Sequence, residues 1–405
     1  RRKEAAVAAI DTPPRSACGA PPQGGAASGP AKPVPRRPLG AFGFAGLWRR
    51  LAGLFGSLLA MGGAKAIELP ENRAEGLYHL YKGGGVTADG PALLVRKSIA
   101  DKVSLSGSYY VDAVSNASID VVTTASPFKE TRKAYDFGVA YAHRDALMSL
   151  GVYRSKEPDY QADSVSIDVA QEVYGNMTTI ALGFTRGVDK VLKHNEPTFN
   201  DNAKHWQYRL GVTQVLTPRL LGSVNLEVVS DDGYLGNPYR VARVFGAAVP
   251  ERNPRTRTSR ALKFRMIGDL GERNAARAEY RYFWDTWNIK AHTLEAGYSR
   301  YVGSDWLADG FARFYKQGKA LFYSDNATSE TLYLSRNRQL SAFRSFGIGG
   351  KLSYVYKRVP GEYELKINGS LERIRFDYSD FTDIRSGEAY TFNANLLQLY
   401  VTATF

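Results

Sequence analysis

Cysteine is almost absent from this sequence, which has one, Cys18, among 405 residues. Because Cys18 lies within the first 66 residues, the remaining chain has no thiol, which excludes a disulfide framework and a thiolate metal site there. No run of about 18 apolar residues without a charge occurs either, so a membrane-spanning helix is excluded. The sequence therefore fits neither a disulfide-rich secreted protein nor a helical membrane protein.

A strong excess of basic charge is also missing outside the N-terminal region. The formal net charge is +13, but residues 1–66 hold ten Lys or Arg against two acidic residues, Glu4 and Asp11. Beyond residue 66 the chain has 43 of the 53 basic residues and 38 of the 40 acidic ones. This near balance is typical of an ordinary protein surface and predicts no nucleic-acid partner. What is abundant is Tyr (25), Phe (19) and Gly (39), which is typical of β-structure with aromatic belts.

The N-terminal segment has the composition of a disordered leader. Residues 1–47 are rich in Pro, Ala, Gly and Arg and show no hydrophobic period, so we expect no folded structure there. The chain does not begin with Met, and its first Met is Met61, which points to a start placed too far upstream or to a fragment.

Residues 48–66 have the pattern of a secretory signal peptide. Trp48-Arg49-Arg50 is a basic flank, Leu51 to Gly62 is a short apolar core, and Ala64-Lys65-Ala66 is a small-x-small cleavage site. The core is too short for a membrane anchor, and the cleavage site disfavours the alternative of a buried helix in a soluble domain. We therefore expect residues 67–405 to be the exported, folded part of the chain.

From residue 67 on, apolar and polar residues alternate in segments of about ten residues, the length of a tilted transmembrane strand. The clearest of these segments are 180–185, 223–228, 262–266, 276–282 and 365–372. A helix cannot hold the two sets on separate faces, because its period is 3.6 residues. The pattern predicts strands with one face toward lipid and the other polar.

The connectors between these segments alternate in length. One set is tight: 100–102, 144–145, 174–176, 217–219, 271–274, 303–305 and 359–361. The other set is mostly longer and polar: 115–131, 155–161, 188–204, 231–257, 318–341 and 378–389. Short periplasmic turns and long extracellular loops are typical of outer-membrane barrels. Counting through them predicts sixteen strands, or fourteen if the first pair, 76–82 and 91–99, packs as a plug.

The C-terminal segment predicts a closing strand with a terminal aromatic residue, a signal that the outer-membrane assembly machinery accepts. Its apolar face consists of Leu397, Leu399, Val401, Ala403 and Phe405. The even strand count places both termini on the periplasmic side.

Several stretches together resemble an uncharacterised, domain-of-unknown-function family of proteobacterial outer-membrane β-barrel proteins. They are Tyr109-Tyr110-Val111-Asp112, 117–123, Gly236-Asn237-Pro238-Tyr239-Arg240, 254–259, Tyr280-Arg281-Tyr282-Phe283, 285–293 and Phe322-Tyr323-Ser324-Asp325. The resemblance covers roughly residues 70–405 and implies a barrel in the outer membrane, with no assigned activity. It also implies a redox setting, because such proteins often accompany a small lipoprotein, a thioredoxin-like protein and a flavin-attaching transferase.

Charged residues on the polar face are the first candidates for function, because charge inside a barrel can line an aqueous path. The predicted lumen-lining residues are Lys263, Arg265, Arg277, Glu279, Arg281, Glu295, Asp309, Arg313, Glu364, Lys366 and Glu372. Both signs are interspersed, which favours cross-strand ion pairing over a purely anion- or cation-selective pore. The two roles are compatible.

The long connector 231–257 is the second candidate. It carries five arginines, Arg240, Arg243, Arg252, Arg255 and Arg257, which could contact lipopolysaccharide phosphates or an anionic solute. The alternative is a folded extracellular cap that only covers the barrel.

Metal binding and catalysis are disfavoured. Asp112 and Asp120 lack the spacing of a calcium site, and Gly83-Gly84-Gly85 fits a turn between strands better than a phosphate loop. No histidine lies in a G-x-S-x-G or H-E-x-x-H motif, so we predict no catalytic residue, metal or cofactor. The tryptophans, including Trp287, are expected in interfacial belts.

These observations predict an all-β protein: a transmembrane antiparallel up-and-down β-barrel in the outer membrane of a Gram-negative bacterium. The favoured function is a porin-like channel or passive transport protein for small polar solutes. The alternative is a structural barrel that holds a periplasmic redox lipoprotein or envelope complex, and an outer-membrane enzyme is less favoured. Expected partners are the lipid bilayer, lipopolysaccharide, the assembly machinery and a periplasmic lipoprotein or redox partner.

Overall fold

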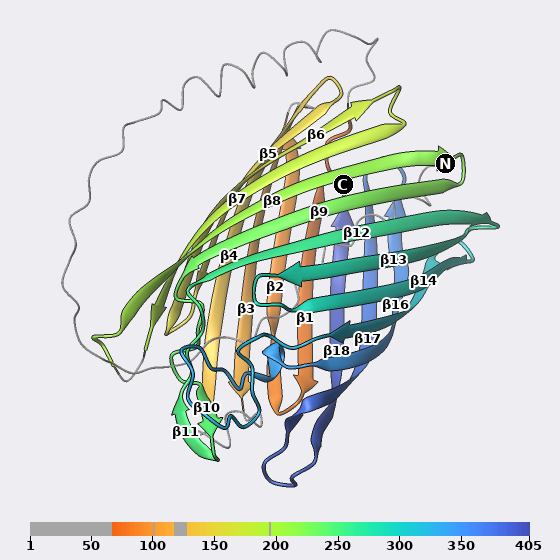
Figure 1. Ribbon diagram of the computed structural model, residues 1–405. Coiled ribbons are helices and arrows are strands. Elements are labelled where there is room, and N and C mark those ends of the chain that lie inside the picture. Colours follow the sequence, from red (N-terminus) through yellow and green to blue (C-terminus); the bar gives the residue numbers. More distant parts are fainter. Residues whose placement is uncertain (1–66, 100–101, 117–127, 194–195) are drawn as a thin grey trace, which may run out of the picture.

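The computed structural model describes residues 67–99, 102–116, 128–193 and 196–405. The predicted leader (1–47), the predicted signal peptide (48–66) and Asp120 lie outside the described residues. Sixteen strands form a closed antiparallel barrel (Figure 1). They are β1 (Arg73–Gly83), β2 (Val86–Ile99), β3 (Val103–Asn116), β4 (Phe128–His143), β5 (Ala146–Lys156), β6 (Tyr160–Val173), β7 (Thr178–Leu192), β8 (Asn200–Thr217), β9 (Leu220–Gly233), β12 (Thr256–Gly271), β13 (Asn274–Asp285), β14 (Lys290–Val302), β15 (Trp306–Gln317), β16 (Phe343–Val359), β17 (Tyr363–Thr382) and β18 (Ala389–Thr404).

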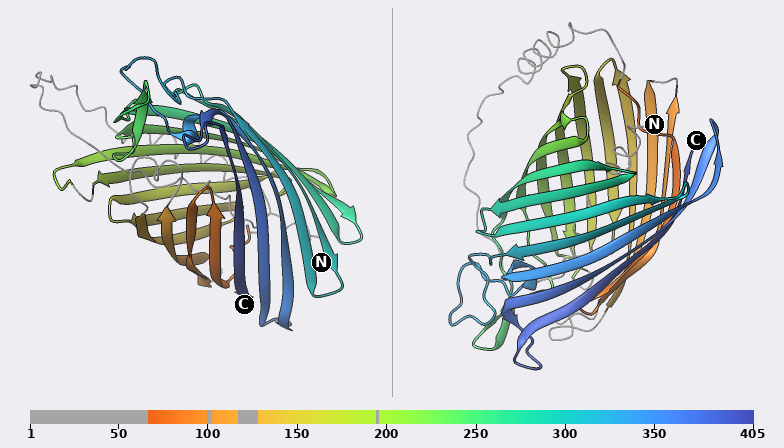
Figure 2. Two further views of the ribbon diagram at one scale, coloured as in Figure 1. Left: turned by 90° about the horizontal axis from the view of Figure 1, so that it is seen from below. Right: turned by 90° about the vertical axis from the view of Figure 1, so that its right-hand side faces the viewer.

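The first strand pair is part of the barrel wall, so the count of sixteen is confirmed and the alternative of fourteen is wrong. β1 pairs with β2 on one side and with β18 on the other, from Arg73 opposite Thr404 to Gly83 opposite Ala394. Figure 2 shows β1 and β18 side by side in both views. The start of β1 and the C-terminus meet there, because the Phe405 amide donates to the Asn72 carbonyl at 3.2 Å.

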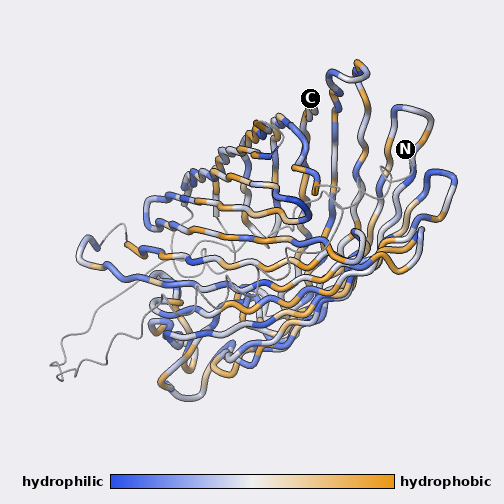
Figure 3. The backbone as a smooth tube through the Cα atoms, turned by 90° about the horizontal axis from the view of Figure 1, so that it is seen from above, coloured by the Kyte–Doolittle hydropathy of each residue, from blue (hydrophilic) through white to orange (hydrophobic). Residues whose placement is uncertain are grey.

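Alternation along the strands produces an apolar outer surface. Large apolar side chains such as Phe346 (54% exposed) and Leu399 (53%) point outward, whereas their strand neighbours point into the barrel. The tube in Figure 3 shows the same alternation of hydrophobic and hydrophilic residues along the strands. Such a surface is unfavourable in water and fits a bilayer, which a closed wall can span because it has no unpaired edge strand. Among the residues that the structure describes, no α-helix has the length and apolar character that a membrane crossing requires.

The tight connectors predicted from the sequence join consecutive strands at one end of the barrel. Arg144, in the two-residue β4–β5 turn, and Asn176, in the four-residue β6–β7 turn, adopt positive φ angles of 53° and 66°, which tight hairpin turns favour. The predicted glycine turn also occurs, at the opposite end of the barrel, where Gly84 and Gly85, at φ 57° and 78°, connect β1 to β2. The end with the tight connectors faces the periplasm.

At the opposite end, two long connectors fold into a cap. The β9–β12 connector contains a hairpin that the sequence did not predict, β10 (Val241–Val244) with β11 (Ala247–Pro250). The β15–β16 connector contains a short 3-10 helix, η1 (Arg338–Leu340). The two connectors touch through bridges from Val244 to Ala327 and from Arg252 to Leu334 (Figure 1). We call these two connectors, residues 234–255 and 318–342, the cap.

A largely aromatic cluster joins the β15–β16 half of the cap to the neighbouring strand ends and the β13–β14 connector. The cluster consists of Trp287, Ile289, Ala320, Tyr323, Leu340, Tyr378, Phe381 and Tyr390. The prediction that Trp287 belongs to an interfacial belt is wrong, because this side chain is 5% exposed and its indole donates to the Thr256 carbonyl at 2.9 Å. Burial in the cap outweighs the general preference of Trp for the membrane interface.

Gly90 is a position where we expect a methyl group to damage the wall. The β2–β3 ladder omits Gly90 and Pro91, and a Cβ at Gly90 would lie 2.0 Å from the carbonyl oxygen of Val111. Because that atom is backbone, Gly90→Ala should lower the free energy of unfolding by about 1–3 kcal/mol, a typical cost of overpacking. The measurement is the urea midpoint, followed by tryptophan fluorescence and by gel mobility without heating.

Gly310→Ala is the matched control. A Cβ at Gly310 meets nothing within 4 Å, so this variant should unfold at or above the wild-type midpoint. Equal midpoints for the Gly90 and Gly310 variants would contradict the steric argument.

Candidate functional site

A continuous set of ion pairs covers the inner wall from β12 to β17. We call it the charge ladder: Lys263, Arg265, Arg277, Glu279, Arg281, Glu295, Asp309, Arg313 and Glu372. These residues alternate with outward apolar residues along their strands, so the structure brings nine of the eleven predicted lumen-lining residues together on the inner face. The other two, Glu364 and Lys366, form a separate pair near the periplasmic end, where Glu364 also binds Arg358.

Arg313 is the best-connected cation of the charge ladder. Its guanidinium lies 2.9 Å from Glu295 and 3.0 Å from Glu372, which is 3% exposed. Arg277 pairs with Asp309 and approaches Glu295 at 3.7 Å. Each carboxylate therefore has a cation beside it, which lowers the cost of placing charge in the wall.

The charge ladder continues onto residues that the sequence analysis did not name as lumen-lining. Glu227 on β9 lies 3.6 Å from Arg281, and Arg209 on β8 donates to Asp168 on β6 at 2.8 Å. The signal was available, because Asp168, Arg209 and Glu227 all occupy polar positions of alternating segments. They were missed because β6, β8 and β9 carry fewer charges each than β12 and β13.

A second polar group lies on the inner wall of β1, β3 and β4. His79 is buried, and its Nε2 lies 2.7 Å from Asp112 and 2.9 Å from the Tyr110 hydroxyl, whose ring stacks on the imidazole. Arg132 approaches Asp112 at 3.8 Å. Asp112 is thus held by the barrel wall. Over the described part of the chain, no group of three or more His, Cys, Asp or Glu has the geometry of a metal site.

His205 is held between two carboxylates that the sequence did not bring together. Its two ring nitrogens lie 2.7 Å from Asp189 on β7 and 2.7 Å from Asp231 on β9, and Tyr160 on β6 also donates to Asp189. Both nitrogens can donate only in the imidazolium form, so the arrangement favours a protonated, structural His205 rather than a general base.

The β15–β16 half of the cap is anchored by buried polar contacts. Arg336 donates to the Asp325 and Thr382 carbonyls at 2.9 and 2.7 Å, and its guanidinium lies over Phe381 at 4.4 Å. Gln317 donates to the Ser341 carbonyl at 2.7 Å. This part of the mouth is therefore a packed structure rather than a loose loop.

The β9–β12 half of the cap contacts several other connectors. The Tyr239 hydroxyl donates to the buried Asp159, 80 residues earlier, at 2.6 Å. Arg255 makes a two-bond contact with Asp201, with both distances 2.8 Å, and Arg252 pairs with Glu330 of the other half of the cap. The cap thus joins connectors that surround the mouth of the barrel.

Four of the five loop arginines singled out from the sequence contact the protein itself. Arg252 and Arg255 make the pairs above, Arg257 pairs with Asp285 at 2.6 Å, and Arg243 donates to the Gly246 carbonyl at 3.3 Å. Their interactions favour the alternative of a folded cap over an arginine-lined site for an anionic solute.

Glu157, in the β5–β6 connector, should make the mouth sensitive to pH. Burial raises its pKa to about 7, with smaller raising contributions from Glu130, Asp112 and Asp159, against the lowering effect of Arg132. The folded mouth therefore favours the protonated carboxyl, and this stabilisation is complete below the ordinary pKa near 4.5 and is lost as pH rises through about 7. We expect faster hydrogen exchange in the connector at pH 8.5 than at pH 5.5, after correction for intrinsic rates.

The isosteric variant Glu157→Gln is the control, because it cannot titrate. Its connector should exchange at one corrected rate across this pH range. A wild-type protein that also shows no pH dependence would contradict a raised pKa at Glu157.

The predicted assembly segment lies on the outer face of β18. Every second residue of this segment faces outward, namely Leu397, Leu399, Val401, Ala403 and Phe405, and Lys97 lies 4.7 Å from the Phe405 ring.

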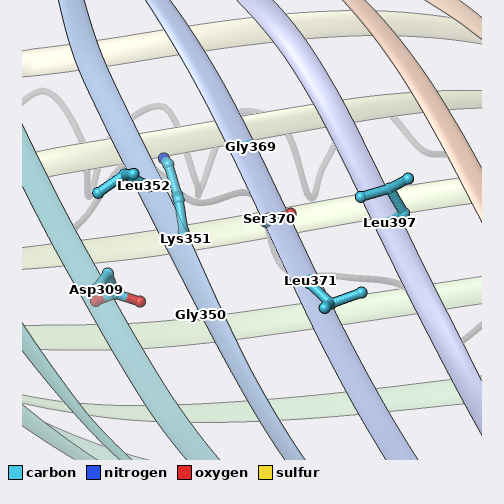
Figure 4. A pocket seen from close by; sticks show the side chains of 8 residues that line it. All are labelled: Asp309, Gly350, Lys351, Leu352, Gly369, Ser370, Leu371 and Leu397. Carbon is cyan, nitrogen blue, oxygen red and sulfur yellow. The ribbon is translucent and has the colours of Figure 1, made fainter.

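A shallow hollow of about 350 Å³ lies in the wall nearby, lined by Asp309, Gly350, Lys351, Leu352, Gly369, Ser370, Leu371 and Leu397 (Figure 4). Its position among outward-facing leucines fits a lipid chain better than a polar solute.

Comparison with known proteins identifies a family but gives no activity. A family model described as "Protein of unknown function (DUF3570)" matches residues 110–199 and 191–368, and the sequence matches no curated protein. A bacterial polysaccharide outer membrane secretin has a TM-score of 0.47 and 9% identity, covering 83% of this chain and 99% of the other.

Two further solved structures match this chain with similar scores. OmpT, an outer membrane protein of Vibrio cholerae, has a TM-score of 0.43 and 8% identity, covering 84% and 100% of the two chains. The siderophore receptor PirA from Pseudomonas aeruginosa has a TM-score of 0.43 and 10% identity, covering 78% of this chain. This chain spans 60% of the length of that receptor. With its closed sixteen-strand wall and apolar outer belt, the protein is a Gram-negative outer-membrane β-barrel.

Proposed function

Since this chain belongs to the DUF3570 family of proteins of unknown function, its activity has to be argued from the barrel itself, and we propose a passive channel for small polar solutes. The observation that carries the proposal is the charge ladder, a polar surface that runs along the inside of a wall whose outside is apolar. A lumen without water would not favour so many ionised groups, because burying them is costly.

The charge balance of the inner wall indicates weak ion selectivity. The eleven predicted lumen-lining residues are six basic and five acidic, and the pairs described above neutralise most of them. A path of this kind favours uncharged or zwitterionic solutes over ions of either sign. The cap at the mouth would set the size limit for entry, and no energy source is needed.

The same ion pairs support a second candidate, a structural barrel with a filled lumen. Cross-strand pairs can close a lumen as well as line it, and such a barrel would hold a periplasmic redox lipoprotein or an envelope complex. Catalysis is the least supported function, because the hydrogen bonds of His79 and His205 in the described residues go to aspartates and to a tyrosine rather than to a Ser, Cys or Thr nucleophile.

Export and assembly belong to the same proposal. We propose that residues 48–66 direct export, that residues 1–47 have no role in the barrel, and that the outward face of Leu397 to Phe405 is read by the assembly machinery. Lipopolysaccharide and a periplasmic lipoprotein remain the proposed partners.

The test is single-channel recording with protein purified from outer membranes and inserted into a planar bilayer. Stable conductance steps that are absent without protein support the channel. A barrel that is folded, as judged by its gel mobility without heating, but shows neither conductance nor uptake of small sugars into proteoliposomes refutes it. In that outcome, a lipoprotein that co-purifies with the barrel favours the structural candidate.

A further inference from the structure

Three lysines form a row on the outer face of the barrel, at the extracellular ends of β4, β5 and β7. They are Lys133, Lys156 and Lys190, which we call the rim lysines, and all three are exposed. Lys133 and Lys156 are direct cross-strand partners. Lys156 lies opposite Gln161 of β6, and Gln161 lies opposite Lys190. The three ammonium groups therefore share one row across four adjacent strands.

The protein does not neutralise this row. Like charges directly opposite each other in an antiparallel pair destabilise it. Within the described ranges, no ion pair or side-chain hydrogen bond joins a rim lysine to another residue. The neighbouring outward carboxylate, Asp163, is already bound by Arg154 at 2.5 Å. The row is thus a cationic surface that lacks an anion, unlike the charge ladder inside the barrel, where each cation has a carboxylate beside it.

The rim lysines lie at the upper boundary of the apolar belt. The outward residues one step below them, about 7 Å along the strand, include Tyr135 (50% exposed) and Val188 (41%). On β7, Arg186 follows on the same face, with its guanidinium 4.1 Å from the centre of the Trp206 ring, an arrangement typical of the membrane interface. The β4–β5 turn at Arg144 is at the other end of these strands, so the row lies at the outer leaflet.

We propose that the rim lysines bind the phosphoryl groups of an anionic glycolipid of the outer leaflet. One phosphate lies between Lys133 and Lys156, whose Cβ atoms are about 5 Å apart in such a pair, so both ammonium groups donate to it. Lys190 and Arg186 bind a second phosphate of the same headgroup, since β5 and β7 are about 10 Å apart. The acyl chains pack on the apolar belt below. A lipid headgroup, rather than free phosphate, is the ligand because the cations directly adjoin lipid-facing side chains.

The test compares the full-length protein with the variant Lys133→Gln, Lys156→Gln, Lys190→Gln. Binding of bis-phosphorylated lipid A is measured in a zwitterionic detergent by native mass spectrometry, alongside dephosphorylated lipid A and inorganic phosphate. Losing three interfacial cations should weaken binding of the bis-phosphorylated lipid by roughly 100-fold. The wild-type protein should bind the dephosphorylated lipid no better than the triple variant binds the phosphorylated one.

The matched control removes three exposed cations from the periplasmic side: Lys102→Gln, Arg219→Gln and Arg300→Gln. This variant has the same net charge as the triple rim variant and should bind lipid A like the wild type. Gel mobility without heating confirms that both variants are folded. Equal weakening of lipid A binding in both variants would show that only the net charge of the protein matters. If inorganic phosphate displaces lipid A at equal phosphate concentration, the ligand of the rim lysines is free phosphate and not the lipid headgroup. Either result overturns the proposal, which does not depend on whether the lumen conducts.

Discussion

Replacing Arg336 by alanine is expected to open the mouth of the barrel. The buried guanidinium pairs with Asp325 at 2.7 Å and satisfies the Thr382 carbonyl, so its loss leaves a carboxylate and a carbonyl without their cation in the cap. Breaking a buried pair typically costs about 3–5 kcal/mol. Local opening of residues 318–342 should therefore increase by roughly 100-fold or more, at about 1.4 kcal/mol per factor of ten. Hydrogen exchange of this segment measures the opening, and single-channel steps should become larger and noisier.

Arg385→Ala is the control for this prediction. Arg385 also pairs with an aspartate, Asp383, in the neighbouring β17–β18 connector, but its side chain is 62% exposed. An exposed pair contributes at most about 1 kcal/mol, so exchange and conductance should stay close to the wild type. If Arg336→Ala leaves the exchange of residues 318–342 unchanged, the cap is not held by this contact.

Replacing Arg313 by alanine is expected to make the path cation-selective. The substitution removes the shared cation of Glu295 and Glu372 and adds one uncompensated negative charge to the charge ladder. A unit charge acts on an ion about 4 Å away with about 1 kcal/mol in bulk water, which is a roughly five-fold preference. The reversal potential in a potassium chloride gradient should therefore shift toward the potassium potential.

Arg375→Ala tests whether the shift comes from the lumen. Arg375 pairs with Asp377 at 2.8 Å on the outward face of β17, so it offers the same chemical change on the lipid side of the wall. Its selectivity should match the wild type. A shift of the same size in both variants would place the effect at the surface, and a shift in neither would argue against conduction past Arg313.

The wall could be predicted from the sequence because its determinants are local. Alternation places Leu262, Phe264 and Met266 on one face and Lys263 and Arg265 on the other wherever the strand lies in space. Turn residues at 144–145 and 174–176 set the hairpin connections in the same local way. Strand count and order follow, because each strand pairs with its neighbour along the chain, with the β10–β11 hairpin excepted.

The cap could not be predicted, because its contacts join distant segments. Tyr239 and Asp159 are 80 residues apart, and Arg252 and Glu330 are 78 residues apart. No period or turn residue encodes such pairs, so Trp287 seemed a belt residue and the loop arginines seemed available for ligands. The charged inner wall could be predicted in part. The parity of the charged residues followed from the sequence, whereas the choice of partner, such as Arg313 with Glu372 on β17, depends on barrel shear and closure.

The joined cap has a consequence for recognition of this protein at the cell surface. Within residues 318–342 the stretch 328–333 is exposed, whereas Leu334 and Ser335 directly after it are buried, so an antibody raised against that peptide would reach only part of it on the folded barrel. An epitope that extends beyond 328–333 is discontinuous, since residues of 234–255 and 318–342 lie side by side through the Arg252 to Leu334 bridge. A substitution in one connector can therefore alter the antigenic surface presented by the other, and serological differences between strains need not map to the residues that an antibody touches.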